Sequence, residues 1–190
     1  MADPNGKVVI ISGPSGAGKS TVVEYLLRSC SLPLRLSISA TTRPPRSGEI
    51  DGQDYFFLDA DHFSELRQND KLLECKEVFR QGHWYGTLRE QVTTGLEAGN
   101  WVILEIDVEG ALAVRQQLPE AVMIFLHAGS RAELENRLRT RGTDSEESIQ
   151  RRLATASREL GASHQYDYTI ENRQPEQAAE QICEFLKAME

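Results

Sequence analysis

Apolar runs alternate with amphipathic stretches along most of the chain. The first run, Lys7–Ser12, is rich in β-branched residues and ends at a Gly-Pro pair, so it predicts a buried strand. Two more buried strands are predicted at Trp101–Ile106 and Val122–Leu126, because continuous apolar runs are typical of parallel sheets that are covered on both faces. A short last strand is expected near Tyr168–Ile170.

Amphipathic segments between these strands predict helices. Apolar residues spaced for one buried face predict a helix over about Lys19–Ser29, a second from about Val108 to Leu118, and a last one that begins near Pro175. The last helix carries an apolar stripe of Ile182, Phe185, Leu186 and Met189. Strands that alternate with helices imply βαβ units, so the expected fold class is α/β with a parallel, doubly wound sheet.

Two segments interrupt this alternation. Residues from about Ser37 to Gly86 are rich in Gly, Pro, Arg and aromatic residues, with strand-like pieces at Tyr55–Leu58 and Leu72–Glu77, and predict a small mixed insertion. Residues from about Arg137 to Arg158 are helical in pattern, highly charged and interrupted at Gly142. On charge alone this second segment is equally well interpreted as a solvated helical hairpin.

Composition narrows the class of protein. The chain has 190 residues, with 21 basic and 29 acidic side chains and a net charge of −8. The length suits one domain with small insertions, and 39% apolar with 26% charged residues exclude general disorder. The acidic balance argues against a nucleic acid polymer as partner, because polymer binding needs a basic face, but it allows a small anionic ligand held by a local basic cluster.

Neither a membrane segment nor a secretory signal is expected. The longest apolar run, Ala121–Leu126, is far shorter than the ~20 residues of a membrane span, and the N-terminal MADPNGK lacks a basic region followed by an apolar one. Cys30, Cys75 and Cys183 are odd in number and far apart, which favours reduced thiols over a disulfide framework. These features predict a cytoplasmic protein.

The segment Gly13–Ser20 reads GPSGAGKS and fits the phosphate-binding pattern G-x-x-x-x-G-K-[ST] in full. Glycines let the backbone N–H groups converge on phosphate oxygens, and the following helix directs its positive end at the same place. Lys19 would add a charge between the β- and γ-phosphates, and Ser20 would offer its hydroxyl to Mg²⁺. The predicted ATP-binding loop residues are Gly13, Pro14, Ser15, Gly16, Ala17, Gly18, Lys19, Ser20 and Thr21. Such a loop indicates nucleotide use, not the type of reaction.

Several further segments together resemble the guanylate kinase family. They are SISATTRPPRSGEIDGQDYFF (37–57), LLECKEVF (72–79), WYGT (84–87), LEIDVEG (104–110) and RLRTRGTDSEESIQRRL (137–153). The resemblance covers nearly the whole chain and implies a P-loop, three-layer parallel sheet core with a small mixed α+β GMP-binding insertion and a helical lid. It implies one domain over 1–190, with the core at about 1–36, 88–136 and 159–190, the insertion at about 37–87 and the lid at about 137–158. The implied reaction is ATP + GMP → ADP + GDP, with Mg²⁺ bound together with ATP.

The resemblance also assigns a GMP site. Arg43 and Arg46, with the Tyr55 hydroxyl and Ser39, are expected to hold the GMP phosphate, since guanidinium groups bind phosphate bidentately. Without the family match, these arginines would be interpreted as a solvated loop. Glu74 would accept the adjacent N1–H and N2–H₂ donors of guanine, which adenine lacks. Thr87 would donate to O6. The remaining GMP-binding candidates are Tyr85 and Asp107; Asp107 would either accept the second N2 proton or support the ligands of Mg²⁺.

No catalytic base is expected, because a phosphate oxygen with a second pKa near 6 is mostly unprotonated at pH 7. The work of bringing two polyanions together is assigned to cations. By resemblance, the catalytic candidates are Lys19, Arg43, Arg137, Arg141 and Arg152. Gly142 is a candidate hinge. Asn172 resembles the adenine-side position of the family, although a plain strand-end turn explains it equally well.

Three features depart from the family pattern. Residues 80–83 lengthen the link before the WYGT motif, Trp84 stands where Tyr is usual, and Glu105 stands where Asp is more usual, which puts a direct metal role for Glu105 in doubt. Two other functions stay open: a non-catalytic guanylate-kinase-like binding module, and another P-loop kinase acting on a sugar phosphate or a different nucleotide. A monomer and a homodimer are equally compatible with the sequence.

Overall fold

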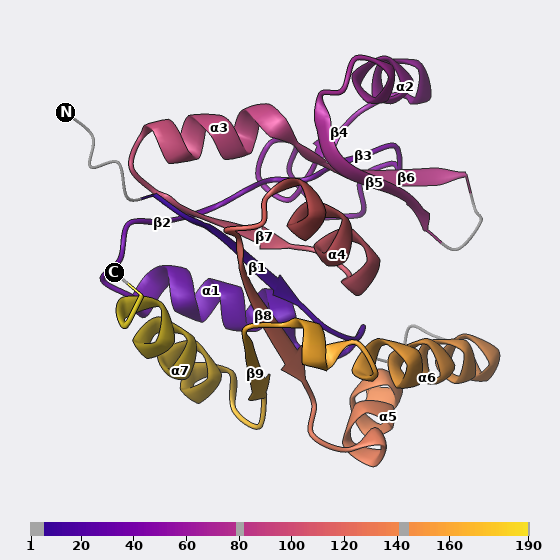
Figure 1. Cartoon of the computed structure of the whole chain (residues 1–190). Coiled ribbons are helices and arrows are strands. Elements are labelled where there is room, and N and C mark those ends of the chain that lie inside the picture. The colour runs from indigo at the N-terminus through magenta and orange to yellow at the C-terminus, as the bar shows by residue number, and fades with distance from the viewer. Residues whose placement is uncertain (1–5, 79–81, 141–144, 190) are drawn as a thin grey trace.

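The computed structural model describes residues 6–78, 82–140 and 145–189 (Figure 1). Its main sheet has five parallel strands in the order β2-β7-β1-β8-β9. The strands are β1 (Val8–Ser12), β2 (Leu34–Leu36), β7 (Trp101–Glu105), β8 (Val122–His127) and β9 (Tyr168–Glu171). The parallel α/β sheet predicted from the sequence is thereby confirmed.

Helices cover both faces of this sheet. On one face lie α1 (Lys19–Ser29) and α7 (Pro175–Lys187), and on the other lie α3 (Arg89–Glu97) and α4 (Val108–Gln117). Side chains along β1 alternate between the two resulting cores: Val9 and Ile11 face one, and Val8 and Ile10 face the other. The continuous apolar run in β1 is explained by this two-sided burial.

A second, four-stranded sheet has the order β4-β3-β6-β5. The strands β3 (Ala40–Thr41) and β4 (Phe56–Phe57) pair in parallel, whereas β5 (Leu72–Val78) and β6 (His83–Leu88) pair antiparallel. Helix α2 (Ala60–Gln68) packs Phe63 against Ala40 and Leu72 to give this sheet a small core of its own. Of the four residues that lengthen the link before WYGT, two, Arg80 and Gln81, lie outside the described residues.

The charged segment after β8 forms two helices, α5 (Arg131–Thr140) and α6 (Glu146–Leu160). They pack on each other through an apolar cluster that includes Leu134, Leu138, Ile149 and Leu153, so the pair has a buried seam and is not simply solvated. In Figure 1 the pair lies at the lower right and the small sheet at the upper right. Arg141 and Gly142, the candidate lid arginine and the candidate hinge, lie outside the described residues. A short 3₁₀ helix (Ser163–Gln165) follows α6.

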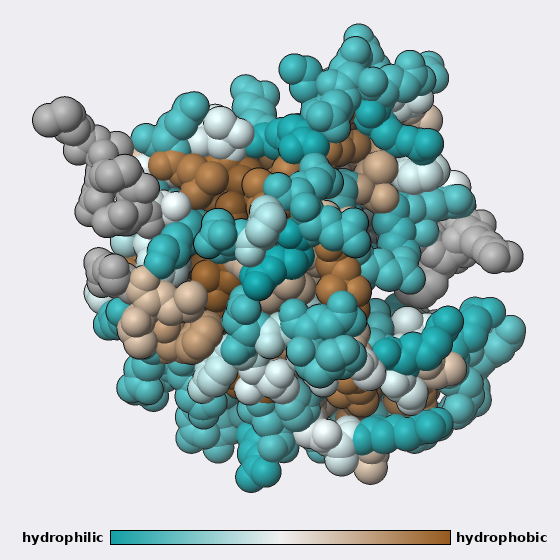
Figure 2. All heavy atoms as spheres, viewed as in Figure 1, coloured by the Kyte–Doolittle hydropathy of each residue, from teal (hydrophilic) through white to brown (hydrophobic). Residues whose placement is uncertain are grey.

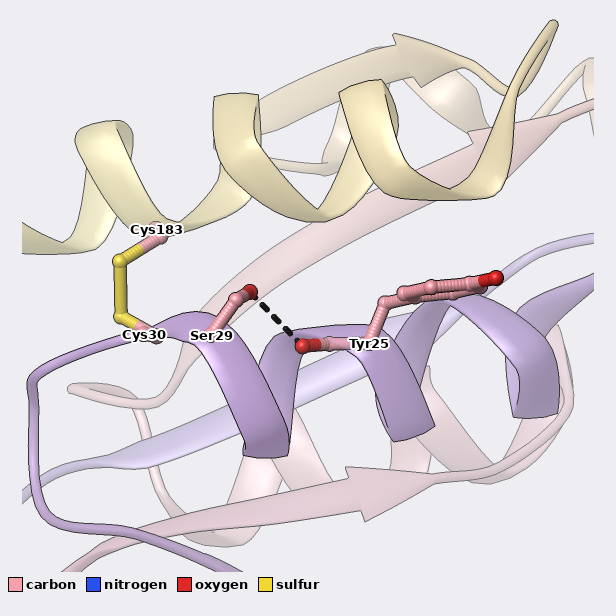
Figure 3. The surroundings of a disulfide bond; sticks show 4 residues. All are labelled: Tyr25, Ser29, Cys30 and Cys183. Carbon is pink, nitrogen blue, oxygen red and sulfur yellow. Dashed lines mark hydrogen bonds between the residues drawn. A yellow bond between two sulfur atoms is a disulfide. The ribbon is translucent and has the colours of Figure 1, made fainter.

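The prediction that all three cysteines are reduced is wrong for two of them. A disulfide joins Cys30, the C-cap of α1, to Cys183 on α7, across a Cα–Cα distance of 5.6 Å (Figure 3). The two helices pack side by side, so residues 153 positions apart in the chain become neighbours. Cys75 is the free thiol, and its burial raises its pKa.

The apolar stripe predicted for the last helix is only partly observed. Ile182 and Leu186 are buried against α1 and the sheet, whereas α7 ends at Lys187 and Met189 beyond it is 36% exposed. Over the described ranges, no helix has the length and apolar content needed to span a bilayer. Polar side chains dominate the face drawn in Figure 2, including the surfaces of α2 and α6.

Candidate functional site

The loop between β1 and α1 has positive φ angles, which favour glycine, at Gly13, Gly16 and Gly18, and at Gly13 and Gly18 a neighbouring atom also leaves no room for a Cβ. Gly13 has φ +141°, and a Cβ there would lie 1.9 Å from the Leu126 carbonyl oxygen on the neighbouring strand β8. Gly18 has φ +86°, and a Cβ there would lie 2.5 Å from Nδ2 of Asn172. The glycines of the motif therefore let the loop press against β8 and the turn after β9 while α1 begins at Lys19.

Lys19 and Ser20 open α1 at the centre of this loop. The Lys19 ammonium donates to the carbonyls of Gly13 at 2.7 Å and Pro14 at 3.2 Å, so it lies over the loop. The Ser20 hydroxyl donates to Oε1 of Glu105 at 2.6 Å. Glu105 ends β7 and pairs in register with Ile11 of β1, so the sheet itself brings this carboxylate to the loop.

Ser20 and Glu105 form a pair of hard oxygen donors, the ligand type that Mg²⁺ prefers. The part of the chain that the structure describes contains no group of three or more His, Cys, Asp or Glu side chains able to hold a metal ion. This donor set fits an ion held mainly by phosphate oxygens and water, with one or two protein ligands. The sequence had placed a metal role for Glu105 in doubt, and the structure positions it beside Ser20.

Two connected hollows extend from the loop. The larger, of about 750 Å³, lies between the loop, α6 and the end of β7. The smaller, of about 440 Å³, lies between α1 and the small sheet. Both are lined by Ser20, Tyr55, Lys76, Tyr85, Glu105 and Asp107.

The smaller hollow contains a carboxylate that is aimed by the pairing of two strands. Glu74 of β5 lies opposite Thr87 of β6, and the Thr87 hydroxyl donates to Oε1 of Glu74 at 2.7 Å. Burial raises the pKa of Glu74, the bond from Thr87 opposes this shift, and the negative charge of Asp107 adds to it. A Cβ on Gly110 would lie 3.1 Å from Oε2 of Glu74 and 3.4 Å from Oδ1 of Asp107, so the two carboxylates flank this glycine closely.

Asp107 is the N-cap of α4, and both of its carboxylate oxygens are engaged. Its Oδ1 accepts a hydrogen bond from the Gly110 N–H at 2.8 Å, and its Oδ2 accepts one from the Lys76 ammonium at 3.0 Å. Lys76 also contacts Oε2 of Glu109 at 2.6 Å. Burial disfavours the charged form of Lys76, but its bonds to Glu109 and Asp107 outweigh this and raise its pKa.

The arginines expected to hold a phosphate are arranged differently from each other. Arg43 donates through both terminal nitrogens to Glu49 at 2.9 Å and through Nε to the Tyr85 hydroxyl at 2.9 Å, and its side chain is only 10% exposed. These bonds hold the pKa of Glu49 below its usual range. The side chain of Arg46 is exposed, and the backbone N–H of Arg46 donates to Oε2 of the same Glu49 at 2.6 Å.

The structure therefore brings Arg43 together with Tyr85 and Tyr55, whose ring lies 5.5 Å from the guanidinium carbon of Arg43. Tyr55 and Ser39 line the smaller hollow, whereas neither arginine does. Glu49, six residues from Arg43, was not singled out in the sequence. The available signal was its negative charge, three residues after Arg46 in the same loop, which indicates an ion pair with one of the two arginines.

Three residues expected in the ATP site, two arginines at the phosphates and Asn172 on the adenine side, converge on the loop from the opposite side. Arg137 of α5 donates to the Asn172 carbonyl at 2.7 Å and to Glu133 at 2.9 Å. Asn172 is buried, and its Nδ2 donates to the Ala17 carbonyl at 2.7 Å. Arg152 of α6 donates to the Ser15 hydroxyl at 3.0 Å. Asn172 therefore does more than form a strand-end turn, because its side chain supports the phosphate loop.

Lys76 and Glu159 are among the charged residues of the larger hollow that were missed in the sequence. Lys76 follows Glu74 by two positions and therefore projects from the same face of β5. Glu159 of α6 lines the hollow, and burial raises its pKa, whereas the charge of Lys19 acts to lower it. Lys76 could have been found by this strand periodicity. No sequence signal singles out Glu159.

Comparisons with known proteins agree on one family. The family model described as guanylate kinase matches residues 5–189 of this chain. A guanylate kinase from Rhodopirellula baltica is 56% identical over 182 residues, which cover 95% of this chain and 87% of that protein. A guanylate kinase from Caldanaerobacter subterraneus is 46% identical over 177 residues, which cover 93% of this chain and 84% of that protein.

A solved structure is similar over the full length. The crystal structure of a guanylate kinase from Anaplasma phagocytophilum matches with a TM-score of 0.78 and 32% sequence identity, covering 100% of this chain and 88% of that chain. The similarity in sequence and the similarity in three-dimensional arrangement thus lead to the same family.

Proposed function

The chain belongs to the guanylate kinase family, and from this premise we propose which of its residues transfer a phosphoryl group from ATP to GMP. The enzyme is a nucleoside monophosphate kinase with the reaction ATP + GMP → ADP + GDP. The observation that carries the residue assignment is the pair of adjoining hollows, one lined by the phosphate loop and the other by Glu74, which accepts a hydrogen bond from Thr87.

The donor nucleotide is assigned to the larger hollow. The N–H groups of residues 13–21, together with Lys19, would hold the triphosphate, and Arg137 and Arg152 would approach it from the helix pair. Asn172 supports the loop and lies beside the expected position of adenine. Arg141, also expected here, lies outside the described residues.

We assign the magnesium ion to Ser20 and Glu105. Bound there with ATP, the ion would neutralise charge on the β- and γ-phosphate oxygens. The hydrogen bond of 2.6 Å between the two side chains indicates that both donors already converge on one point. Asp107, two residues further along the chain, is assigned to the acceptor side because its carboxylate is engaged by Lys76 and Gly110.

The acceptor nucleotide is assigned to the smaller hollow. Glu74 would accept the N1–H and one N2 proton of guanine, and Asp107 would accept the other N2 proton. Thr87 would donate to O6, which requires its single hydroxyl proton to turn away from Oε1 of Glu74. Ser39, Tyr55 and Tyr85 lie where the ribose and phosphate of GMP would enter. Arg43 and Arg46 would bind the phosphate, which requires their loop to move toward the hollow or Arg43 to exchange part of its contact with Glu49.

Transfer requires positioning rather than proton abstraction. The attacking GMP oxygen is already mostly unprotonated at neutral pH. The residues therefore bring two polyanions in line, stabilise the charge of the transferring group and exclude water, which would otherwise accept it. The five-stranded sheet with its helices would be the core, and the small sheet with α2 would be the GMP-binding insertion. The α5–α6 pair would be the lid, which would close over both nucleotides.

The assembly and location are proposals as well. The enzyme would work in the cytoplasm, where both nucleotides are metabolised, as a monomer or a homodimer. The Cys30–Cys183 disulfide is the one observation against this location, since disulfides are rare in reducing compartments.

A coupled assay of ADP release tests the assignment. GMP, AMP, CMP and UMP are compared side by side at equal concentration, with a control lacking any acceptor to measure ATP hydrolysis. We expect rapid ADP release with GMP and at least about a hundredfold lower kcat/KM with AMP, because adenine leaves the pocket's polar groups unpaired. Equal use of AMP or of a sugar phosphate would contradict the assigned base pocket.

A further inference from the structure

Lys76 is a charged residue in the cleft to which the phosphoryl transfer assigns no role. It projects from β5 on the same face as Glu74 and lines both the donor hollow and the acceptor hollow. Its side chain is 38% exposed, so it lies at the edge of the base pocket and not in the core. A cation at this place stands between the small sheet and the start of α4.

The contacts of Lys76 fix the orientation of one carboxylate. Its ammonium binds Oδ2 of Asp107, while the Gly110 N–H binds Oδ1. The Asp107 carboxylate is therefore held from both sides, one from the backbone of its own helix and one from the neighbouring sheet. Glu109, exposed at the rim, binds the same ammonium and tethers it from the solvent side.

Lys76 also balances charge in the base pocket. Glu74 and Asp107 flank Gly110 closely, and each carboxylate acts on the other as a like charge. The Lys76 charge acts on Glu74 in the opposite sense. Without Lys76, repulsion from Glu74 would push Asp107 out of the pocket, because only the Gly110 N–H would remain to hold it.

We propose that Lys76 is a positioning residue that holds Asp107 against the exocyclic 2-amino group of guanine and thereby lets the enzyme distinguish guanine from hypoxanthine. The proposal rests on the assignment of GMP to the smaller hollow. Guanine and hypoxanthine share N1–H and O6, so Glu74 and Thr87 contact both bases. They differ only in the 2-amino group. Discrimination between GMP and IMP therefore reports on the two carboxylates that face this group, and Lys76 acts on it through its contact with Asp107.

The test compares wild type, Lys76→Met, Lys76→Gln and Lys76→Arg. Initial rates are measured with GMP and with IMP at saturating ATP, and with varied ATP at saturating GMP. Lys71→Met is the matched control, since Lys71 is an exposed lysine of the same small sheet region, just before β5. Thermal melting of each variant shows whether it is folded, and Lys76→Gln keeps a polar side chain if the Met variant is poorly folded.

We expect Lys76→Met and Lys76→Gln to lower kcat/KM for GMP about tenfold, the value of one charge-assisted hydrogen bond, and kcat/KM for IMP less than about twofold. The loss appears in KM for GMP, whereas kcat and KM for ATP stay within about twofold. Lys76→Arg, which keeps the charge, restores most of the GMP preference, and Lys71→Met behaves as wild type.

Three results would overturn the proposal. Equal losses with GMP and IMP would make Lys76 a structural brace between β5 and α4. A higher efficiency with GMP in Lys76→Met would mean that Lys76 competes with the base for Asp107. Unchanged kcat/KM with both GMP and IMP would show that Lys76 has no part in base recognition. Absence of GMP phosphorylation by the wild-type enzyme in the same assay would instead refute the proposed function itself.

Discussion

Gly110 provides a sharp test of the base pocket, because a single methyl group there enters the space between two carboxylates. Alanine at this position would place its Cβ 3.1 Å from Oε2 and 3.3 Å from Cδ of Glu74, and 3.4 Å from Oδ1 of Asp107. The first two separations are shorter than ordinary van der Waals contact, so the Glu74 side chain must shift by a few tenths of an ångström. The methyl would also keep water and ligand donors away from both carboxylates.

The substitution should change stability little and weaken GMP binding strongly. Gly110 lies in the first turn of α4 without a positive φ, so alanine would favour the helix by up to about 1 kcal/mol. The contact with Glu74 opposes part of this gain, and the unfolding free energy should change by less than about 1 kcal/mol. A displaced Glu74 would lose one charge-assisted hydrogen bond to guanine, about 1.5–3 kcal/mol, which corresponds to a GMP affinity roughly 10- to 150-fold lower.

The assay is titration calorimetry of wild type and Gly110→Ala with GMP and with an ATP analogue, together with urea unfolding of both proteins. Only the GMP affinity should fall. Gly95→Ala is the matched control, because its Cβ would lie 2.5 Å from Cγ2 of Val102 in the core between α3 and β7. The control should lose stability without a loss specific to GMP. Wild-type GMP affinity in Gly110→Ala would refute the conclusion that Glu74 and Asp107 recognise the base.

Four further predictions concern Lys19, Glu74 and the disulfide. Lys19→Met should abolish phosphoryl transfer while circular dichroism shows an unchanged fold, and measurable turnover would remove the loop lysine from the mechanism. Because the pKa of Glu74 is raised, KM for GMP should begin to rise at a higher pH than an ordinary carboxyl group would cause as the pH falls. Glu74→Gln should lose this pH dependence of KM for GMP, and KM for ATP should not show it in either protein. Because the folded-state pKa of Glu74 is raised, the unfolding free energy of the free protein should fall as pH rises from the unfolded carboxyl range to that pKa, more steeply than in Glu74→Gln; equal slopes in urea titrations would contradict this. Reduction of Cys30–Cys183, which closes a loop of 153 residues, should lower the unfolding free energy by about 3–5 kcal/mol, and titration of three thiols in unreduced, denatured protein would show that the bond is absent.

The elements that the sequence predicted well are those with a strong local signal. The strands β1, β7 and β8 are continuous apolar runs, and α1 has bounds of Lys19–Ser29, as predicted, because its apolar spacing begins directly after the glycine loop. By contrast, β3 contains only two residues and exists only through its pairing with β4 and β6. No window of sequence contains that information. The three-residue β2 depends in the same way on β7.

In the candidate site too, residues of a contiguous motif could be predicted, whereas contacts between distant segments could not. The phosphate loop is contiguous, so its residues could be named from the motif. Glu105 approaches Ser20 across 85 positions through the pairing of β7 with β1, and Lys76 approaches Asp107 across 31 positions because β5 packs against α4. The disulfide is likewise a product of helix packing, since the number of cysteines says nothing about which helices meet. Side chains that act through tertiary neighbours are therefore the ones that the sequence left unassigned.

The end of β7 explains how the two nucleotides could be held at a constant separation. Glu105 and Asp107 lie two residues apart, yet one contacts Ser20 at the phosphate loop and the other contacts Lys76 at the base pocket. Residues Val102, Ile103 and Leu104 of the same strand are buried and paired with β1, so this junction belongs to the most rigid part of the core. Under the proposed assignment, the small sheet and the α5–α6 pair would close around this junction. The core would then set the distance over which the phosphoryl group passes, and the two closing parts would exclude water from it.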